Sequence, residues 1–152
     1  MKPLMLFRAG LLAMVLVASL NATAADGGRK YITTDPSLAQ LPFTEAVQAG
    51  DTLYVSGTLG LDAKTQQAAA DTKTEAKLAL DAVQHLLEVS GYKMDDLVSV
   101  TVYCTDLQLY GLFNDTYKTY FHGHFPARAF IGVKELVRGA HFEVMGTAVK
   151  QH

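Results

Sequence analysis

The chain has 152 residues, with 13 Lys or Arg against 15 Asp or Glu and a formal net charge of −2, which allows one ordinary domain. Charges of one sign do not cluster, so the sequence excludes the basic surface that a nucleic-acid groove requires. A single cysteine, Cys104, excludes an internal disulfide, and no His/Cys cluster has the spacing of a zinc site.

The first 24 residues have the three regions of a secretory signal peptide. Lys2 and Arg8 make the start positive, residues 11–20 are apolar throughout, and Ala22-Thr23-Ala24 places small residues before a cut. An uncleaved membrane anchor is the alternative, but the apolar run is shorter than the ~20 residues that span a bilayer. We expect cleavage after Ala24 and a secreted, periplasmic protein with no membrane attachment.

Cleavage would leave 11 basic and 15 acidic residues, because the signal holds two basic residues and no acidic one. After the cut, residues 26–29 form a short polar leader. From residue 30 onward the composition does not shift, which indicates one domain. We divide the chain into a signal peptide at 1–24, a leader with the first strand at 25–40, and the rest of the domain at 41–152, the domain as a whole being 30–152.

Three short strands are expected first. They are residues 31–34, 46–48 and 52–56. Ala49-Gly50-Asp51 is typical of a hairpin turn between the second and the third. In the third strand Leu53 and Val55 share one face, while Tyr54 and Ser56 share the other. Gly57 and Gly60 then predict a loop that runs to about residue 70.

The first helix is predicted over residues 73–89. Thr72 and Glu75 have the spacing of a capping box, in which a hydroxyl and a carboxylate satisfy the first free amides. Gly91 favours a left-handed stop after Ser90. Apolar residues recur on one face at helical spacing, namely Ala76, Leu80, Val83 and Leu87, with Ala79 and Leu86 beside them.

Residues 97–105 alternate in the manner of a half-buried strand. The side chains expected on the buried face are Val98, Val100, Val102 and Cys104. Cys104 is therefore interpreted as a small core residue in preference to a reactive thiol. Asp106 can cap a second helix that extends to about His122, with a stripe formed by Phe113, Tyr117 and Tyr120.

Two closing strands are predicted at residues 127–133 and 142–149, with Gly139 in the turn between them. The element order indicates an α+β fold, in which one mixed sheet of about six strands carries two helices on one face. The other face would carry Tyr54, Tyr103 and Phe130 and would be covered by no element of this chain. We therefore expect an oligomer.

Two charged residues fall within the closing strands. Alternation places Ala129, Ile131 and Val133 on the apolar face, so that Arg128 is expected on the opposite one, and Glu143 opposite Phe142 and Val144. One interpretation is a structural or interface ion pair, since an unpaired buried charge is costly. The other is a functional pair, in which the guanidinium binds a substrate carboxylate and Glu143 polarises a water.

Other candidate chemistry is weaker. His122 and His124 could both reach one metal ion from a loop, but no third ligand is evident and we interpret them as solvated. His85 is expected on the surface of the first helix. No glycine-rich phosphate loop is present, because Gly57-Thr58-Leu59-Gly60 lacks the required spacing and the Lys.

Five segments together resemble the RidA (YjgF) family. The segments are 41–47 with 53–57, 95–106, 113–117 with 120–121, 125–129 and 142–144. Phe125-Pro126-Ala127-Arg128-Ala129 is similar to the family signature Phe-Pro-Ala-Arg-(Ser/Ala), and the strand ending in Ser56-Gly57 is similar to its opening motif. The matches occur in order, with small gaps, from about residue 41 to residue 149.

The resemblance implies a chorismate-mutase-like α+β fold, a homotrimer whose sheets form a central barrel, and sites in the clefts between subunits. It implies hydrolysis of enamines and imines, such as 2-aminoacrylate, to 2-keto acids and ammonia with no cofactor. Arg128 matches the residue that binds the substrate carboxylate, and Glu143 the catalytic residue that positions water. Ser56 and Asn114 match polar positions of the substrate-binding cleft.

The chain departs from the family pattern at three positions. Phe43 stands where the well-studied deaminases carry Tyr, Phe130 where many members have Cys, and Thr58 where Gln is common. We expect Phe43 and Phe130 to line a more apolar pocket. Three other functions stay open: a non-catalytic trimer that binds small carboxylates, a ribonuclease, which the acidic charge disfavours, and a chaperone-like role.

Overall fold

The computed structural model describes residues 28–150. The predicted signal peptide and its cleavage site lie outside these residues, so the expected secretion stays a prediction. Within residues 28–150, no helix has the length and the apolar composition needed to cross a membrane.

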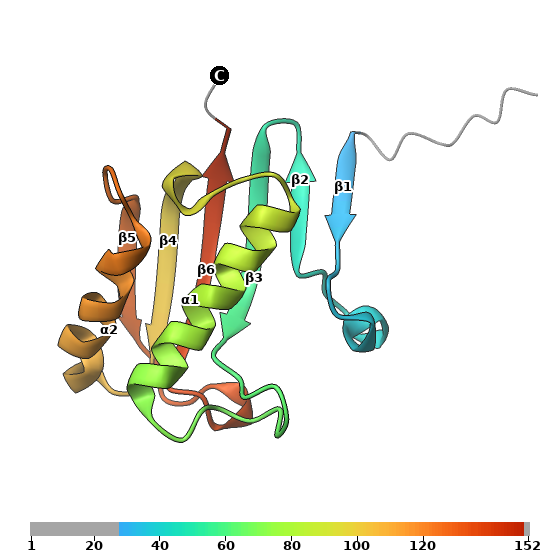
Figure 1. The fold of residues 1–152 in the computed structure, drawn as a ribbon. Coiled ribbons are helices and arrows are strands. Elements are labelled where there is room, and N and C mark those ends of the chain that lie inside the picture. The colour runs from blue at the N-terminus through green and yellow to red at the C-terminus, as the bar shows by residue number, and fades with distance from the viewer. Residues whose placement is uncertain (1–27, 151–152) are drawn as a thin grey trace, which may run out of the picture.

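Six strands form one sheet, and two helices lie on one of its faces (Figure 1). The strands are β1 (Arg29–Ile32), β2 (Ala46–Ala49), β3 (Thr52–Leu59), β4 (Leu97–Cys104), β5 (Ala127–Gly132) and β6 (Phe142–Val149). The helices are α1 (Thr72–Val89) and α2 (Tyr110–Tyr117). The strand order is β1-β2-β3-β6-β4-β5, and every neighbouring pair is antiparallel except β4 and β5, which are parallel. The predicted mixed sheet with two helices on one face is confirmed.

Short 3₁₀ helices connect these elements. They are η1 (Pro36–Gln40), η2 (Met94–Asp96), η3 (Leu107–Leu109), η4 (Lys118–Tyr120) and η5 (Val137–Gly139). The predicted turns also form where a positive φ is needed: Gly50, Gly91 and Gly139 have φ values of 59°, 80° and 69°. The first strand begins two residues earlier than expected, and β3 continues three residues beyond Ser56.

Helix α1 begins with a cap different from the predicted one. Asp71 is the N-cap residue, and its side chain accepts a hydrogen bond from the Thr74 amide at 2.9 Å. The capping box of Thr72 and Glu75 was therefore wrong. Glu75 is fully buried and accepts hydrogen bonds from the amides of His141 (2.5 Å) and Phe142 (2.9 Å), so it connects α1 to the start of β6.

The core lies between α1 and the sheet. The predicted helix stripe is buried throughout: Ala76, Ala79, Leu80, Val83, Leu86 and Leu87. On β4, Val100, Val102 and Cys104 are buried as expected, and burial raises the pKa of the Cys104 thiol. Val98 is 48% exposed instead, because a register irregularity against β6 between Leu97 and Ser99 turns it outward.

The second helical segment is broken into pieces. Asp106 caps η3 by accepting from the Gln108 amide, and α2 follows with buried Phe113 and Tyr117. The chain then tightens into η4 before β5. The predicted helix to His122 therefore exists as an α-helix of eight residues between two 3₁₀ turns.

The faces of β5 are reversed relative to the sequence expectation. Arg128 and Phe130 pair in register with Val100 and Val102 and so share the face that α2 covers. Ala129 and Ile131 lie on the other face, and Ile131 is 40% exposed. The expectation failed because β5 is an edge strand, at which the aromatic residues of α2 cover a charged side chain while small apolar ones face outward.

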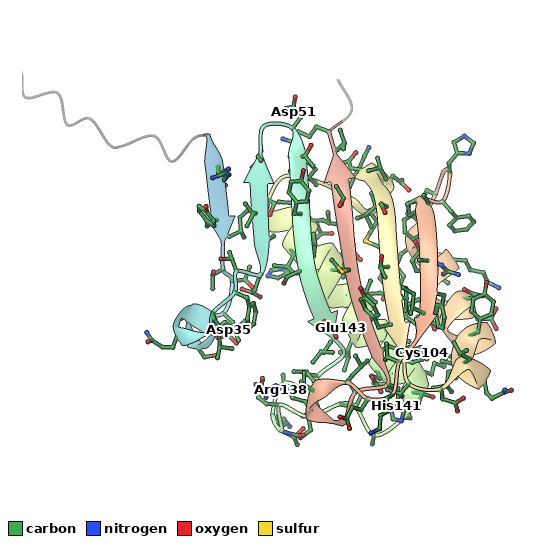
Figure 2. The ribbon with its side chains drawn as sticks, turned by 180° about the vertical axis from the view of Figure 1, so that it is seen from behind. Asp35, Asp51, Cys104, Arg138, His141 and Glu143 are labelled. Atoms are coloured by element: carbon green, nitrogen blue, oxygen red, sulfur yellow. The ribbon has the colours of Figure 1, made fainter. Side chains whose placement is uncertain are left out.

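The face turned away from the helices carries no other element of residues 28–150 (Figure 2). Its exposed apolar side chains include Tyr54, Val98, Ile131 and Met145, and the Tyr103 hydroxyl lies 3.7 Å from the Met145 sulfur. The expected position of Phe130 on this face was wrong. The rest of the expectation stands: this sheet face is uncovered within residues 28–150 and mixes aromatic and aliphatic side chains with polar ones such as Thr101 and Thr147, which is compatible with an interface between copies.

Candidate active site

Arg128 is fixed by a hydrogen bond to helix α2. Its Nη2 donates to the Asn114 side-chain oxygen at 2.6 Å, a short bond strengthened by the charge of the donor. Within residues 28–150 no carboxylate lies within ion-pair distance of the guanidinium. A guanidinium has five N–H donors, so Arg128 keeps donors for a ligand.

Aromatic rings surround the same guanidinium. Its carbon atom lies 4.5 Å from the centre of the Tyr117 ring and 5.8 Å from those of Tyr110 and Phe130. Ring faces attract a cation and exclude water, which strengthens any ion pair that Arg128 makes with a ligand. Phe130, predicted in the pocket, is thus one wall of the Arg128 site.

The phenols beside Arg128 differ in environment. Burial raises the pKa of Tyr117 to about 12, although the charge of Arg128 opposes that shift, and the hydroxyl has no hydrogen-bond partner within residues 28–150. Tyr110 is 49% exposed. Hydrogen bonding to Asn114, followed by the charge of Arg128, lowers the pKa of Tyr110.

Glu143 occupies a different part of the molecule. It pairs in register with Leu59 of β3 and Tyr103 of β4, opposite the buried faces of Phe142 and Val144 as predicted. Its carboxylate crosses directly over Gly57, where an added Cβ would lie 1.7 Å from Oε1. The register of β3 against β6 is irregular between Val55 and Thr58, so this glycine sits where the ladder is interrupted.

A cleft of about 940 Å³ opens beside Glu143. Its lining includes three of the predicted site residues, Phe43, Ser56 and Glu143, together with Glu45, His85 and Arg138. Phe43 is half exposed. Figure 2 shows Glu143 near the end of β3, with Arg138 of η5 below it and Asp35 beside η1.

The two glutamates of this cleft have different tasks. Glu45 accepts hydrogen bonds from the Thr34 amide and hydroxyl and from the Asp35 amide (3.2 Å), so it fixes the chain before η1. Glu143 has no hydrogen bond or ion pair within residues 28–150. Glu143 is therefore the cleft carboxylate that is free to hold a water.

The six predicted site residues form two groups of three. Asn114 and Phe130 accompany Arg128 on the helix-covered side, whereas Phe43 and Ser56 accompany Glu143 in the cleft. Because Arg128 and Glu143 belong to opposite faces of the sheet, the interpretation of an ion pair between them within one chain was wrong. An ion pair between copies stays open.

The histidines predicted to be exposed are His85, which lines the Glu143 cleft, and His122 and His124, which lie outside its lining. His122 and His124 are exposed, and so is His85, as predicted. Within residues 28–150 no three His, Cys, Asp or Glu side chains are grouped so that they could hold a metal ion.

A family profile described as Endoribonuclease L-PSP matches residues 34–150. The chain belongs to this family, also known as RidA or YjgF.

Named relatives agree with this membership. The chain is 38% identical over 124 residues to the 2-iminobutanoate/2-iminopropanoate deaminase of Mus musculus, an alignment that covers 80% of this chain and 92% of the mouse protein. The crystal structure of RidA from Psychrobacter sp. PAMC 21119 superposes with a TM-score of 0.73 at 28% identity, covering 80% of this chain and 99% of that one. Escherichia coli TdcF, crystallised with bound serine, superposes with a TM-score of 0.69 at 26% identity, covering 72% and 89%.

Three residues of the candidate site had no functional role assigned to them from the sequence. Gly57 was interpreted as a loop residue, although a glycine in a strand often marks a close approach. Tyr110 lies four residues before Asn114 on one helix, a spacing that places both on one face. No sequence pattern marks Arg138, because only the folded chain brings it to the cleft. Its backbone is left-handed there (φ 58°), and its Nη1 donates to the Gln66 carbonyl at 2.9 Å.

Proposed function

We propose that this chain hydrolyses reactive 2-imino acids and their enamines, such as 2-aminoacrylate, to 2-keto acids and ammonia. The observation that carries the proposal is the Arg128 guanidinium, which is fixed by Asn114, enclosed by rings and unpaired with any carboxylate of residues 28–150. Such a group matches the carboxylate of a small organic acid. The mouse relative bears a deaminase name, and the serine bound by TdcF carries a carboxylate.

The active form is a homotrimer with sites between copies. One copy holds Arg128 and Glu143 on opposite faces of its sheet, so a single chain does not bring them to one substrate. The uncovered sheet face supplies the apolar surface that association would bury. In the trimer, Arg128 of one copy approaches the Glu143 cleft of the next.

The reaction needs two steps. Arg128 holds the carboxylate, and Glu143 accepts a proton from a water whose oxygen bonds to the imine carbon, while the C=N pair moves to nitrogen. Glu143 gives that proton to the nitrogen of the carbinolamine. The carbinolamine hydroxyl then passes its proton to Glu143, the C–N bond breaks with its electron pair going to nitrogen, and ammonia leaves; for a substrate that entered as the protonated imine, Glu143 releases the extra proton to solvent. Orientation and modest polarisation suffice for this reaction, so these side chains accomplish it without a cofactor.

Pocket chemistry and location narrow the substrate. Phe43 and Phe130 place apolar rings at two positions of the proposed site, which favours imino acids with small apolar side chains. The predicted signal peptide would take the protein to the periplasm. There it would meet imines released by amino-acid oxidases.

An oxidase-coupled assay tests the function. An amino-acid oxidase generates the imine, and release of ammonia and keto acid is followed with wild type, Arg128→Ala and Arg29→Ala. Arg29 is an exposed arginine of the opposite edge strand, so its variant matches the change in charge. We expect wild type and Arg29→Ala to accelerate hydrolysis and Arg128→Ala to lose at least ~100-fold in kcat/KM. An Arg128→Ala protein as active as wild type would contradict the assignment.

A carboxylate-binding protein without turnover is the second candidate. The serine bound by TdcF motivates it, since that similar structure holds an amino acid. Calorimetry with pyruvate separates the two: binding without acceleration of imine hydrolysis would favour the second. The family description also names an endoribonuclease, and the net charge of −2 argues against RNA binding. Cleavage of RNA that weakens steeply with salt would contradict this argument.

A further inference from the structure

We propose that Tyr110 is a catalytic acid that protonates the β-carbon of an enamine substrate, so that the same site forms the imine before hydrolysing it. This inference rests on the proposed function and adds a step to it. Water attacks an imine carbon, whereas the corresponding carbon of an enamine is not electrophilic. An enzyme that accelerates enamine consumption therefore needs a proton donor besides the carboxylate that handles water.

Tyr110 stands beside the proposed carboxylate anchor. It is the first residue of α2, one turn before Asn114. Its ring meets Phe130 edge to face at 5.0 Å, and the Arg128 guanidinium carbon lies 5.8 Å from its centre. About half of the Tyr110 surface is exposed, whereas Tyr117, the other phenol beside Arg128, is 4% exposed. Of these two hydroxyls, that of Tyr110 is the one accessible to a ligand.

A chain of hydrogen bonds prepares Tyr110 to release its proton. The Asn114 oxygen accepts from Arg128, so the NH₂ group of that amide is left to donate to the Tyr110 oxygen. That donation and the nearby guanidinium both stabilise a phenolate, and they lower the pKa of Tyr110, whereas burial raises that of Tyr117. The proton of Tyr110 is not used in this chain of bonds and is free for a substrate.

Proton transfer from Tyr110 converts the enamine to its imine. The C=C electron pair of the enamine takes the Tyr110 proton and forms a new C–H bond at the β-carbon, while the nitrogen lone pair forms the C=N bond. The product is the protonated imine, its carboxylate still on Arg128. The Tyr110 phenolate, held by Asn114 and Arg128, regains a proton from solvent water. Hydrolysis through Glu143 then proceeds as for an imine.

Stereochemistry in heavy water tests this step. A threonine dehydratase supplies 2-aminocrotonate in D₂O, and the 2-oxobutanoate formed is reduced at once by lactate dehydrogenase to prevent exchange. The configuration of deuterium at C3 is read by NMR for wild type, Tyr110→Phe and Tyr31→Phe. Tyr31 is an exposed tyrosine of β1, at the opposite edge of the sheet, and serves as the matched control.

We expect one configuration from wild type and Tyr31→Phe, and a mixture from Tyr110→Phe with about a 10- to 100-fold loss of enamine acceleration. On 2-iminobutanoate generated by an oxidase, which needs no protonation at C3, the loss in Tyr110→Phe should be much smaller than its loss on the enamine. A single configuration from Tyr110→Phe at the wild-type rate would overturn the inference. An equal mixture from an active wild type would overturn it too, while the hydrolytic function stands; a wild type inactive on oxidase-generated imine would overturn the function itself.

Discussion

The two halves of the proposed site are built by opposite means. Around Arg128 the packing is dense: aromatic rings from β5 and α2 surround the guanidinium, and the hydrogen bond to Asn114 fixes its orientation. Around Glu143 the packing is open: Gly57 leaves room for the carboxylate, which lines an open cleft. The difference teaches that one half is suited to binding and the other to placing water, and that one copy does not join them.

Loss of the Glu143 carboxylate should produce the largest effect. Glu143→Gln keeps the size of the side chain but cannot take the proton of water, so kcat should fall by about 10²–10⁴-fold with a small change in KM. Steady-state rates on oxidase-generated imine measure this. Glu45→Gln, which alters the structural glutamate of the same cleft, should lower stability more than kcat. Equal losses of kcat in both variants would contradict the assignment of Glu143 to water activation and of Glu45 to a structural role.

The second-largest effect is expected from a methyl group at Gly57, which would displace the Glu143 carboxylate. In Gly57→Ala the new Cβ would lie 1.7 Å from Glu143 Oε1, so the carboxylate must move, and kcat should fall by roughly 10-fold or more. Gly123→Ala is the matched control, because nothing lies within 4 Å of the added carbon. Circular dichroism establishes that both variants fold. Wild-type kcat in a folded Gly57→Ala protein would mean that the close approach has no catalytic role.

Removal of the Asn114 amide should act on the binding half alone. Asn114→Ala frees Arg128 to adopt other rotamers, so KM should rise by about 5- to 10-fold while kcat changes less. Keto-acid inhibition constants provide an independent measure of the same loss. A variant that changed kcat and left both KM and inhibitor affinity untouched would place Asn114 in the chemical step and not in the binding of the carboxylate.

The smallest effect is expected from restoring a hydroxyl in the cleft. Phe43→Tyr adds a hydroxyl to a half-exposed ring and leaves the ring itself unchanged. The rate with one imine should therefore shift by only about two- to threefold, with a larger change in the ratio between polar and apolar imino acids. Competition between oxidase-generated imines of serine and of 2-aminobutyrate measures that ratio. An unchanged ratio would remove Phe43 from the residues that determine specificity.

Local pattern sufficed for most of the fold. The stripe of α1, the alternation of β4 around Val102 and the glycines of the turns follow from periodicity and backbone freedom, and the structure confirms them. Glu75 was misassigned because its partners, His141 and Phe142, are 66 and 67 residues away, and a capping motif is visible only locally. Val98 was misassigned because the irregular register between β4 and β6 cannot be predicted from the alternation of apolar and polar residues.

The site was predictable as residues but not as an arrangement. The family resemblance supplied Arg128, Asn114 and Glu143 by position. Alternation alone then placed Arg128 on the wrong face, because the rings that cover it come from another element. The cleft beside Gly57 depends on how β3 pairs with β6, which cannot be predicted from either segment alone.

Mixing two inactive variants tests the central claim most directly. Arg128→Ala and Glu143→Gln are each prepared separately, and then unfolded and refolded together in equal amounts so that copies exchange. If the site joins Arg128 of one copy to Glu143 of the next, random trimers should regain roughly a quarter of the wild-type activity. A mixture that refolds into trimers yet remains as inactive as its parents would contradict the shared site.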